Sequence, residues 1–259
     1  MDWKKVSEAN KNFYDQIASI YDQVDSRRRE IKHEWIDQVL IHCREILTKK
    51  FPQESFSFLD AGTGSGLLAL QAKNYFNNLI LVDISQAMLD QIKLENSKKI
   101  VADCASIPLE ENSVHMIGAF ATLHHLFRPK TFFLEAKRIL KVGGILYTDH
   151  DIEENFVNNF NFPLKVYRKL FDHGINYLER CPEAKKVDYE LSEFHGEKGL
   201  SGKKLAADLE SLGFKVLELT FHWQGMGIPG KIINSLTLNN LFNREGMSPI
   251  IRIIAQKVK

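Results

Sequence analysis

The sequence predicts an α/β protein in which a mostly parallel sheet carries helices on both faces. Between residues 56 and 149, short apolar runs typical of buried strands alternate with stretches of helical apolar spacing. The same alternation resumes from residue 201. Because strand–helix–strand units cross over with a right hand, the carboxyl ends of the strands should meet along one edge of the sheet, where ligands bind in such folds.

The elements predicted from the sequence follow that alternation along one domain. Strands are expected at 56–60, 79–83, 99–102, 114–120, 145–149, 214–221 and 250–257, with helices at 65–75, 86–95, 130–140 and 201–212. Residues 1–50 carry two helical apolar stripes, and residues 151–200 are rich in aromatic residues and asparagine. We therefore expect an N-terminal helical segment (1–50), a core (51–150), a cap insertion (151–200) and a C-terminal completion of the sheet (201–259).

Composition and charge exclude several classes of protein. The 259 residues carry a formal net charge of +1, which argues against nucleic acid or an anionic membrane as the dominant partner. The first residues lack a signal-peptide core, and no apolar run approaches transmembrane length. The three cysteines are isolated, so neither a disulfide framework nor a zinc knuckle is indicated. We expect a cytoplasmic protein without membrane insertion; its oligomeric state is not predicted.

A glycine-rich turn follows the first expected strand and predicts a ligand site. The strand ends at Asp60 and is followed by Gly62, Gly64 and Gly66, which let a ligand approach the backbone closely. The helix that follows directs its first N–H groups toward such a ligand. A second apolar strand ends at Asp83, where a nucleoside-binding fold places a carboxylate for the ribose hydroxyls. Together they predict a site for a nucleoside-type cofactor.

Several ordered motifs resemble those of class I S-adenosylmethionine-dependent methyltransferases. They are Asp60–Gly66, the acidic end of the second strand at Asp83, the segment 102–109, the Leu-His-His-Leu stretch within 119–126, and the segment 136–146. The nearest resemblance is to the small-molecule group that includes ubiquinone and menaquinone biosynthesis enzymes. It covers roughly residues 10–150 well and implies a Rossmann-like, doubly wound, seven-stranded sheet. Residues 1–50 then act as a lid and 51–150 as the S-adenosylmethionine-binding core.

The resemblance also implies a role for each cofactor-binding residue. Gly62 and Gly64 would approach the methionine part, with Asp60 on its ammonium, while Asp83 would accept from the ribose hydroxyls and Ile84 would pack on the adenine. Asp103 would accept from the adenine amino group, and the Cys104 N–H would bond a ring nitrogen. Backbone at Phe120 and Ala121 would line the methionine tail, over which Tyr14 and Tyr21 would close, and Gly66 completes the glycine turn.

The candidate catalytic residues are those that can accept a proton near the strand ends, namely His124, His125, His150 and Asp149. Methyl transfer from a sulfonium needs mainly the alignment of the acceptor, the methyl carbon and the leaving sulfur. A base is required only where the acceptor must lose a proton. No metal is predicted, because sequence alone does not bring enough ligands together. The aromatic cap favours an aromatic or hydrophobic small-molecule acceptor.

Three other functions stay open at the level of sequence. A non-catalytic protein that binds S-adenosylmethionine would carry the same donor motifs. A nucleotide-dependent oxidoreductase usually spaces its last two glycines three apart, whereas Gly62, Gly64 and Gly66 alternate evenly. Methyltransferases that modify base amino groups often carry Asn-Pro-Pro-Tyr after the fourth strand, where this chain has Ala119-Phe-Ala-Thr-Leu-His. The last two are therefore less favoured than a small-molecule methyltransferase.

Overall fold

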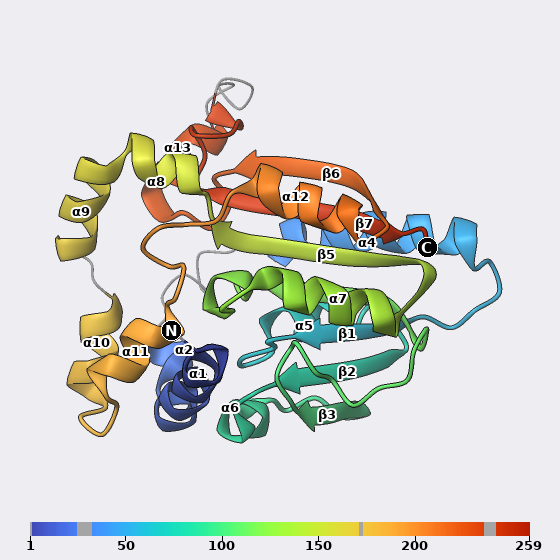
Figure 1. Ribbon diagram of the computed structural model, residues 1–259, viewed down its shortest axis with the longest axis horizontal. Coiled ribbons are helices and arrows are strands. Elements are labelled where there is room, and N and C mark those ends of the chain that lie inside the picture. Colours follow the sequence, from blue (N-terminus) through green and yellow to red (C-terminus); the bar gives the residue numbers. More distant parts are fainter. Residues whose placement is uncertain (1, 25–32, 171–172, 236–241) are drawn as a thin grey trace.

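The computed structural model describes residues 2–24, 33–170, 173–235 and 242–259. Seven strands form one sheet in the order β3-β2-β1-β4-β5-β7-β6 (Figure 1). They are β1 (Ser57–Ala61), β2 (Asn78–Asp83), β3 (Ser97–Val101), β4 (Val114–Phe120), β5 (Leu140–Ile152), β6 (Phe214–His222) and β7 (Ile250–Lys257). Among these strands, only β7 runs antiparallel to its neighbours β5 and β6. The expected doubly wound, mostly parallel sheet is confirmed.

Helices cover both faces of the sheet because neighbouring strand residues point to opposite sides. On one face, α7 (Pro129–Ile139) and α12 (Gly202–Ser211) pack on Leu59 and Ile117. On the other, α4 (His33–Lys50) and α5 (Leu67–Ala72) pack on Phe58 and Met116. Further helices along the chain are α6 (Gln86–Gln91), the short 3-10 turn η1 (Leu123–His125) and α13 (Gly227–Ser235).

The N-terminal helices and the insertion gather beyond the carboxyl ends of the parallel strands, at the left of Figure 1. The first group is α1 (Trp3–Ile17) and α2 (Tyr21–Val24); the second is α8 (Glu154–Asn159), α9 (Asn161–Leu170), α10 (His173–Arg180) and α11 (Lys186–Ser192). Phe13 and Ile17 of α1 share an apolar cluster with Tyr177, Cys181 and Ala184. The first part of the expected lid, α1 and α2, therefore packs against the expected cap, whereas α4 of the same segment packs on a face of the sheet. No helix within the described ranges is long and apolar enough to cross a membrane.

Four predicted element boundaries were wrong by three residues or more. Helices α5 and α6 end at Ala72 and Gln91, earlier than expected. The fifth strand begins at Leu140 instead of residue 145, so Gly143 and Gly144 lie inside β5. The same strand continues to Ile152, beyond its predicted end at Asp149. The pairing of β5 with β7 shifts between Asp149 and Asp151, which marks a bulge at His150.

Candidate active site

A cavity of about 640 Å³ opens at the carboxyl edge of the sheet. The strand ends form one wall, and α1 with α2 forms the opposite one. Most of the residues predicted to bind the cofactor line it: Asp60, Gly62, Gly64, Asp83, Ile84, Asp103, Cys104, Phe120, Ala121, Tyr14 and Tyr21. Gly66 does not line the cavity and instead precedes α5 in the left-handed conformation. The residues of the donor motifs therefore converge on a single cavity.

The glycine turn is held in a conformation that requires glycine. Gly62 and Gly64 have φ of 67° and 55°, in the left-handed region. A Cβ built on Gly62 would lie 2.5 Å from Thr122 Cγ2 of the turn after β4, so this glycine lets the two turns touch. At Gly64 there is room for a Cβ, and its N–H donates to Asp83 Oδ2 at 2.8 Å. The turn thus joins the ends of β1, β2 and β4.

Asp60 organises the same turn from below. Its Oδ2 accepts from Thr63 Oγ1 at 2.7 Å and from the Ala69 N–H at 3.0 Å. The second bond satisfies an amide in the first turn of α5, which has no acceptor inside the helix. The side chain is buried and lines the cavity floor. Asp60 therefore has a structural role in this turn as well as a position from which it can meet a cationic ligand.

Asp83 places a buried carboxylate at the end of β2. Its Oδ2 accepts from Gly64, and its Oδ1 accepts from the Ser85 N–H at 2.9 Å. Burial raises the pKa of this carboxyl from 3.8 to about 6, against the lowering effect of these backbone donors. Burial thus makes the ionised form costly, and a ligand that donates hydrogen bonds would stabilise it.

Asp103 and Cys104 follow β3 at the next strand end. Asp103 Oδ1 accepts from the Ala105 N–H at 2.8 Å, and its Oδ2 accepts from Ser7 Oγ at 2.6 Å. Burial, together with the nearby carboxylates of Asp103 and Asp83, raises the pKa of the Cys104 thiol. Such a thiol stays protonated and is a poor nucleophile. Cys104 therefore fits a small wall residue rather than a covalent catalyst.

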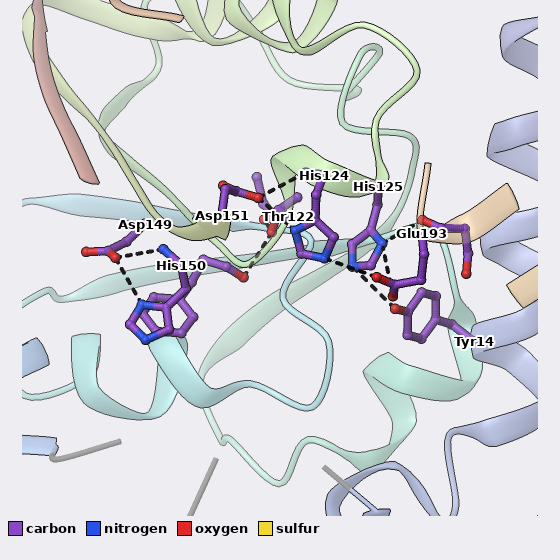
Figure 2. A network of polar contacts seen from close by, with 11 residues as sticks. Tyr14, Thr122, His124, His125, Asp149, His150, Asp151 and Glu193 are labelled. Carbon is purple, nitrogen blue, oxygen red and sulfur yellow. Dashed lines mark hydrogen bonds and ion pairs between the residues drawn. The ribbon is translucent and has the colours of Figure 1, made fainter. Parts of the chain in front are cut away.

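The N-terminal helices close the cavity through specific polar contacts. Three of these are hydroxyl-to-carboxylate hydrogen bonds between the helices and the strand-end turns: Ser7 to Asp103 (2.6 Å), Ser85 to Asp15 (2.6 Å) and Ser65 to Asp22 (2.5 Å). The rings of Tyr14 and Tyr21 lie 6.0 Å apart, edge to face, on the cavity wall. Figure 2 shows Tyr14 beside the histidines of η1.

The two histidines of η1 are fixed by different partners (Figure 2). His125 Nδ1 lies 2.7 Å from the Ser192 carbonyl oxygen, which only accepts, so that nitrogen carries the proton. Its Nε2 lies 3.3 Å from the Tyr14 hydroxyl and accepts from it. His124 donates from both its backbone N–H and its Nδ1 to Asp151 Oδ1, at 2.9 and 2.8 Å. Of the two, His125 lines the cavity.

Asp149 and His150 occupy a separate buried cluster behind the cavity wall. Asp149 accepts from Tyr147 (2.9 Å), His222 (3.0 Å) and Arg252 (2.8 Å), as well as from His150 Nδ1 (2.9 Å). Burial opposes its ionisation, but His222, His150 and Arg252 outweigh that effect and hold the pKa of Asp149 well below its ordinary value. Neither residue lines the cavity.

His150 adopts a φ of 65°, which is uncommon for a residue with a side chain. Its ring stacks on Phe120 with 4.2 Å between centroids. This strained residue supports the back of a cavity-lining aromatic side chain. The structure thus separates the four predicted catalytic residues: His125 lies on the cavity wall, His124 lies beside it, and Asp149 and His150 lie behind it.

Sequence reasoning missed several residues that the fold brings to the cavity. The α1 residues Trp3, Ser7 and Asn10 line it, as do Phe127 and Arg128 after η1. The sequence of α1 reveals only the apolar stripe that packs on the cap. The polar residues beside that stripe form no recognisable motif. Glu193 and Asp151, which contact the histidines, likewise lie outside the motifs. Only tertiary packing assigns them.

Comparison with known proteins finds a methyltransferase domain in the chain. Residues 59–148 match the family model of a methyltransferase domain. An uncharacterised protein of Methanocaldococcus jannaschii is 26% identical over 211 residues, which cover 81% of this chain and 84% of that protein. Malonyl-[acyl-carrier protein] O-methyltransferase of Hahella chejuensis is 27% identical over 152 residues, which cover 56% of this chain and 49% of that enzyme.

Solved structures share the fold over nearly the whole chain. An S-adenosylmethionine-dependent methyltransferase of Thermotoga maritima, described as a possible histamine N-methyltransferase, superposes with a TM-score of 0.58 at 14% identity. That match covers 96% of this chain and 99% of that one. The Haloferax volcanii protein solved in complex with the Trm112 methyltransferase activator gives 0.57 at 15% identity, again covering 96% and 99%. At these identities the structures support the fold and carry no information on the acceptor.

The fold, the strand-end cavity and the family match together support an S-adenosylmethionine-dependent methyltransferase of class I. Residues 59–148 are the part of the chain that matches the methyltransferase-domain model. The resemblance drawn from the sequence motifs is confirmed.

Proposed function

We propose that the cavity binds S-adenosylmethionine and that the methyl group passes to a small-molecule acceptor by direct in-line displacement. The observation that carries this proposal is the buried Asp83 carboxylate, hydrogen-bonded to the Gly64 amide at the strand-end edge. It offers the charged acceptor that two ribose hydroxyls require, next to a backbone turn that a ligand can approach.

The other cavity residues divide between the two ends of the donor. Ile84, Asp103 and Cys104 form the end for the adenine, with Asp103 accepting from its amino group and the Cys104 N–H bonding a ring nitrogen. Asp60, Gly62 and Gly64 take the methionine end, with Phe120 and Ala121 along its tail and Tyr14 and Tyr21 above it. Gly66 acts by starting α5. In this arrangement Ser7 occupies the Asp103 oxygen that the adenine amino group would share.

Catalysis then consists mainly of alignment. Holding acceptor oxygen, nitrogen or carbon in line with the methyl carbon and the sulfur contributes on the order of 7–11 kcal/mol. Where the acceptor must lose a proton, His125 is the candidate on the cavity wall, because its Nε2 carries the lone pair and its Nδ1–H is anchored on Ser192. Asp149 and His150 then act as support for Phe120, and His124 as support for His125.

The acceptor class is inferred from the chemistry of the wall. Trp3, Leu126 and Phe127 give the cavity apolar surface, which favours an aromatic or hydrophobic acceptor. The enzymes named among the relatives and neighbours act on chemically different acceptors, so the acceptor of this chain is not inherited from them. A non-catalytic donor-binding protein is the alternative that the same donor site would fit.

Calorimetric titration with S-adenosylmethionine, S-adenosylhomocysteine and NADH tests the donor assignment. We expect micromolar binding of the first two and none of NADH. Absence of binding by either adenosyl ligand would overturn the proposal. Catalysis is tested by transfer of a labelled methyl group to a panel of phenols, aromatic amines and carboxylic acids. Donor binding without turnover on any of them would favour the non-catalytic alternative.

A further inference from the structure

His124, His125 and Glu193 bring three metal-binding side chains to the edge of the cavity. Each offers one ligand atom, and the three atoms lie within 4.8 Å of one another. His124 Nε2 lies 3.9 Å from Glu193 Oε2, and His125 Nδ1 lies 3.9 Å from Glu193 Oε1 (Figure 2). Ligands about 2.1 Å from a tetrahedral zinc ion are about 3.4 Å apart, so small side-chain rotations close these distances.

Both imidazoles already have the outer partners that metal-ligating histidines use. His124 Nδ1 donates to Asp151 Oδ1 at 2.8 Å, which directs its Nε2 lone pair away from Asp151. A carboxylate on the far nitrogen fixes the ring and strengthens it as a ligand. In His125 the far nitrogen is Nε2, which faces the Tyr14 hydroxyl at 3.3 Å. A hydroxyl both donates and accepts, so Tyr14 can bond this nitrogen in either tautomer.

Without an ion, the proton on His125 Nδ1 lies between that nitrogen and the Ser192 carbonyl oxygen, 2.7 Å away. An ion bound to Nδ1 takes the place of this proton, which reaches Nε2 through solvent, so the neutral ring changes tautomer and releases no net proton. The carbonyl oxygen of Ser192 is 2.7 Å from Nδ1, closer than two ligands of one tetrahedral ion, so it must move back by several tenths of an ångström to become a further ligand. The resulting donor set is two imidazole nitrogens, a carboxylate and a carbonyl oxygen, which suits divalent zinc-type cations.

Charge supports a cation at this place. Asp151 has a side chain that is 2% exposed, and its Oδ2 has no hydrogen-bond partner in the described part of the chain. Such a buried carboxylate oxygen is costly unless a positive charge lies nearby. Together with Glu193 it provides two carboxylates, whose charge one divalent ion balances.

The second histidine–carboxylate group of the chain provides an internal comparison. Asp149, His150 and His222 also hold ligand atoms within 4.8 Å of one another. There, however, Arg252 Nε lies 2.8 Å from Asp149 and already supplies the positive charge. A metal ion would have to displace or repel that guanidinium. The Asp149 group is therefore an internal salt-bridge cluster, whereas the group around Glu193 has the composition of a cation site.

We propose that His124, His125 and Glu193, with the Ser192 carbonyl, bind one divalent zinc-type cation. Because His125 and Tyr14 line the cavity, the ion would sit at its edge, where it can hold an oxygen atom of the acceptor. This inference goes beyond the proposed methyl transfer and does not depend on it, since binding of the ion needs no methyl donor. With the ion on Nδ1, Nε2 of His125 carries the proton, so in that form the ion would act on the acceptor oxygen in place of His125 as a base.

The test is equilibrium dialysis of the purified full chain, first stripped with a chelator, against Zn²⁺ and separately against Co²⁺. Bound metal is counted by mass spectrometry, and Co²⁺ is also followed by its visible absorption. We expect one ion per chain at micromolar concentration, with tighter binding as pH rises from 6 to 8 because imidazole binds a metal ion only in its neutral form. Glu193→Gln and His124→Asn should each weaken binding at least tenfold.

The matched control is His42→Asn, which removes an exposed imidazole of α4 that pairs with Glu218 of β6. It should bind the ion as the wild type does. Circular dichroism and thermal unfolding without metal verify that all variants are folded. The proposal is refuted if the wild type binds no ion, or if Glu193→Gln and His124→Asn bind as tightly as His42→Asn. Titration of the metal-free chain with S-adenosylhomocysteine measures the donor site separately, so loss of metal binding can be told apart from loss of donor binding.

Discussion

Replacing Asp83 by asparagine tests the donor site at its most informative position. The substitution keeps the size of the side chain and one acceptor oxygen, but it removes the charge. In the proposed complex the two ribose hydroxyls donate to this carboxylate. The substitution therefore separates a charged acceptor from a merely polar one, without opening a cavity in the wall.

The magnitude follows from two opposing effects. Burial raises the Asp83 pKa from 3.8 to about 6, which corresponds to about 3 kcal/mol of cost for the ionised form in the empty cavity. Hydrogen bonds to a charged group are each worth about 1.5–3 kcal/mol. A net loss of about 1–3 kcal/mol is therefore expected for Asp83→Asn, which is roughly a 5- to 150-fold weaker affinity for S-adenosylmethionine.

Isothermal titration with S-adenosylmethionine measures this loss, and urea unfolding of the empty protein provides the check on folding. Stability should change much less than affinity, because removal of the buried charge offsets the loss of one backbone hydrogen bond. Asp90→Asn, an exposed carboxylate on α6 that bonds Gln86, is the matched control and should bind normally. Wild-type affinity in Asp83→Asn would refute the assignment of this strand end.

The remaining predictions concern pH, the buried charge cluster and the glycine turn. Because ribose hydroxyls favour ionised Asp83, the pKa of Asp83 should fall when the donor binds, and donor affinity should rise between pH 5 and pH 7 and then level off. Titrations in buffers of different ionisation enthalpy should detect proton release near pH 6, and an affinity that does not change with pH would contradict this prediction. Asp149→Asn leaves the buried Arg252 without its charged partner and should lower the free energy of unfolding, measured in urea, by about 3–5 kcal/mol, while the folded protein keeps its donor affinity. A variant that is fully stable but has lost methyl transfer would instead indicate that Asp149 is a catalytic residue. Gly62→Ala places a Cβ 2.5 Å from Thr122 Cγ2 at positive φ and should lower the free energy of unfolding by about 1–3 kcal/mol in the same assay. The double variant Gly62→Ala/Thr122→Ala should regain part of that stability. If the single variant is as stable as the wild type, the turn can move to accommodate the Cβ.

The convergence of the strand-end residues on one cavity could be predicted from the sequence because these residues stand at fixed positions relative to strands. Asp60, Asp83 and Asp103 each end or closely follow an apolar run, and parallel strands bring such positions to one edge. Asp149 follows the same rule in the sequence, yet β5 continues past it. The reason is non-local: Ile250 and Ile251 of β7 pair with Ile152 and Asp151, which extends the strand and leaves Asp149 inside it.

The contacts of the N-terminal helix and the insertion with the cavity could not be predicted, because these residues meet only through packing. Glu193 reaches the histidines from the end of the insertion, where no motif surrounds it. Ser7 reaches Asp103 because α1 lies across the cavity, a placement set by the contacts of Phe13 with Tyr177 and Tyr189. Helical periodicity identifies α1 as amphipathic, but it does not say which surface the helix covers.

Helix α1 makes the two halves of the site share one wall. Ser7 bonds Asp103 at the proposed adenine end, Asn10 donates to the His125 carbonyl at 3.2 Å, and Tyr14 bonds the His125 ring. The same helix packs through Phe13 on the insertion that follows β5. A ligand at either end must therefore accommodate, or displace, contacts made by one rigid element. Adenine would compete with Ser7 for Asp103, and Ser7 lies one helical turn from Asn10, which holds the His125 carbonyl. Binding of the donor should therefore change the positions of His125 and Glu193 relative to the acceptor.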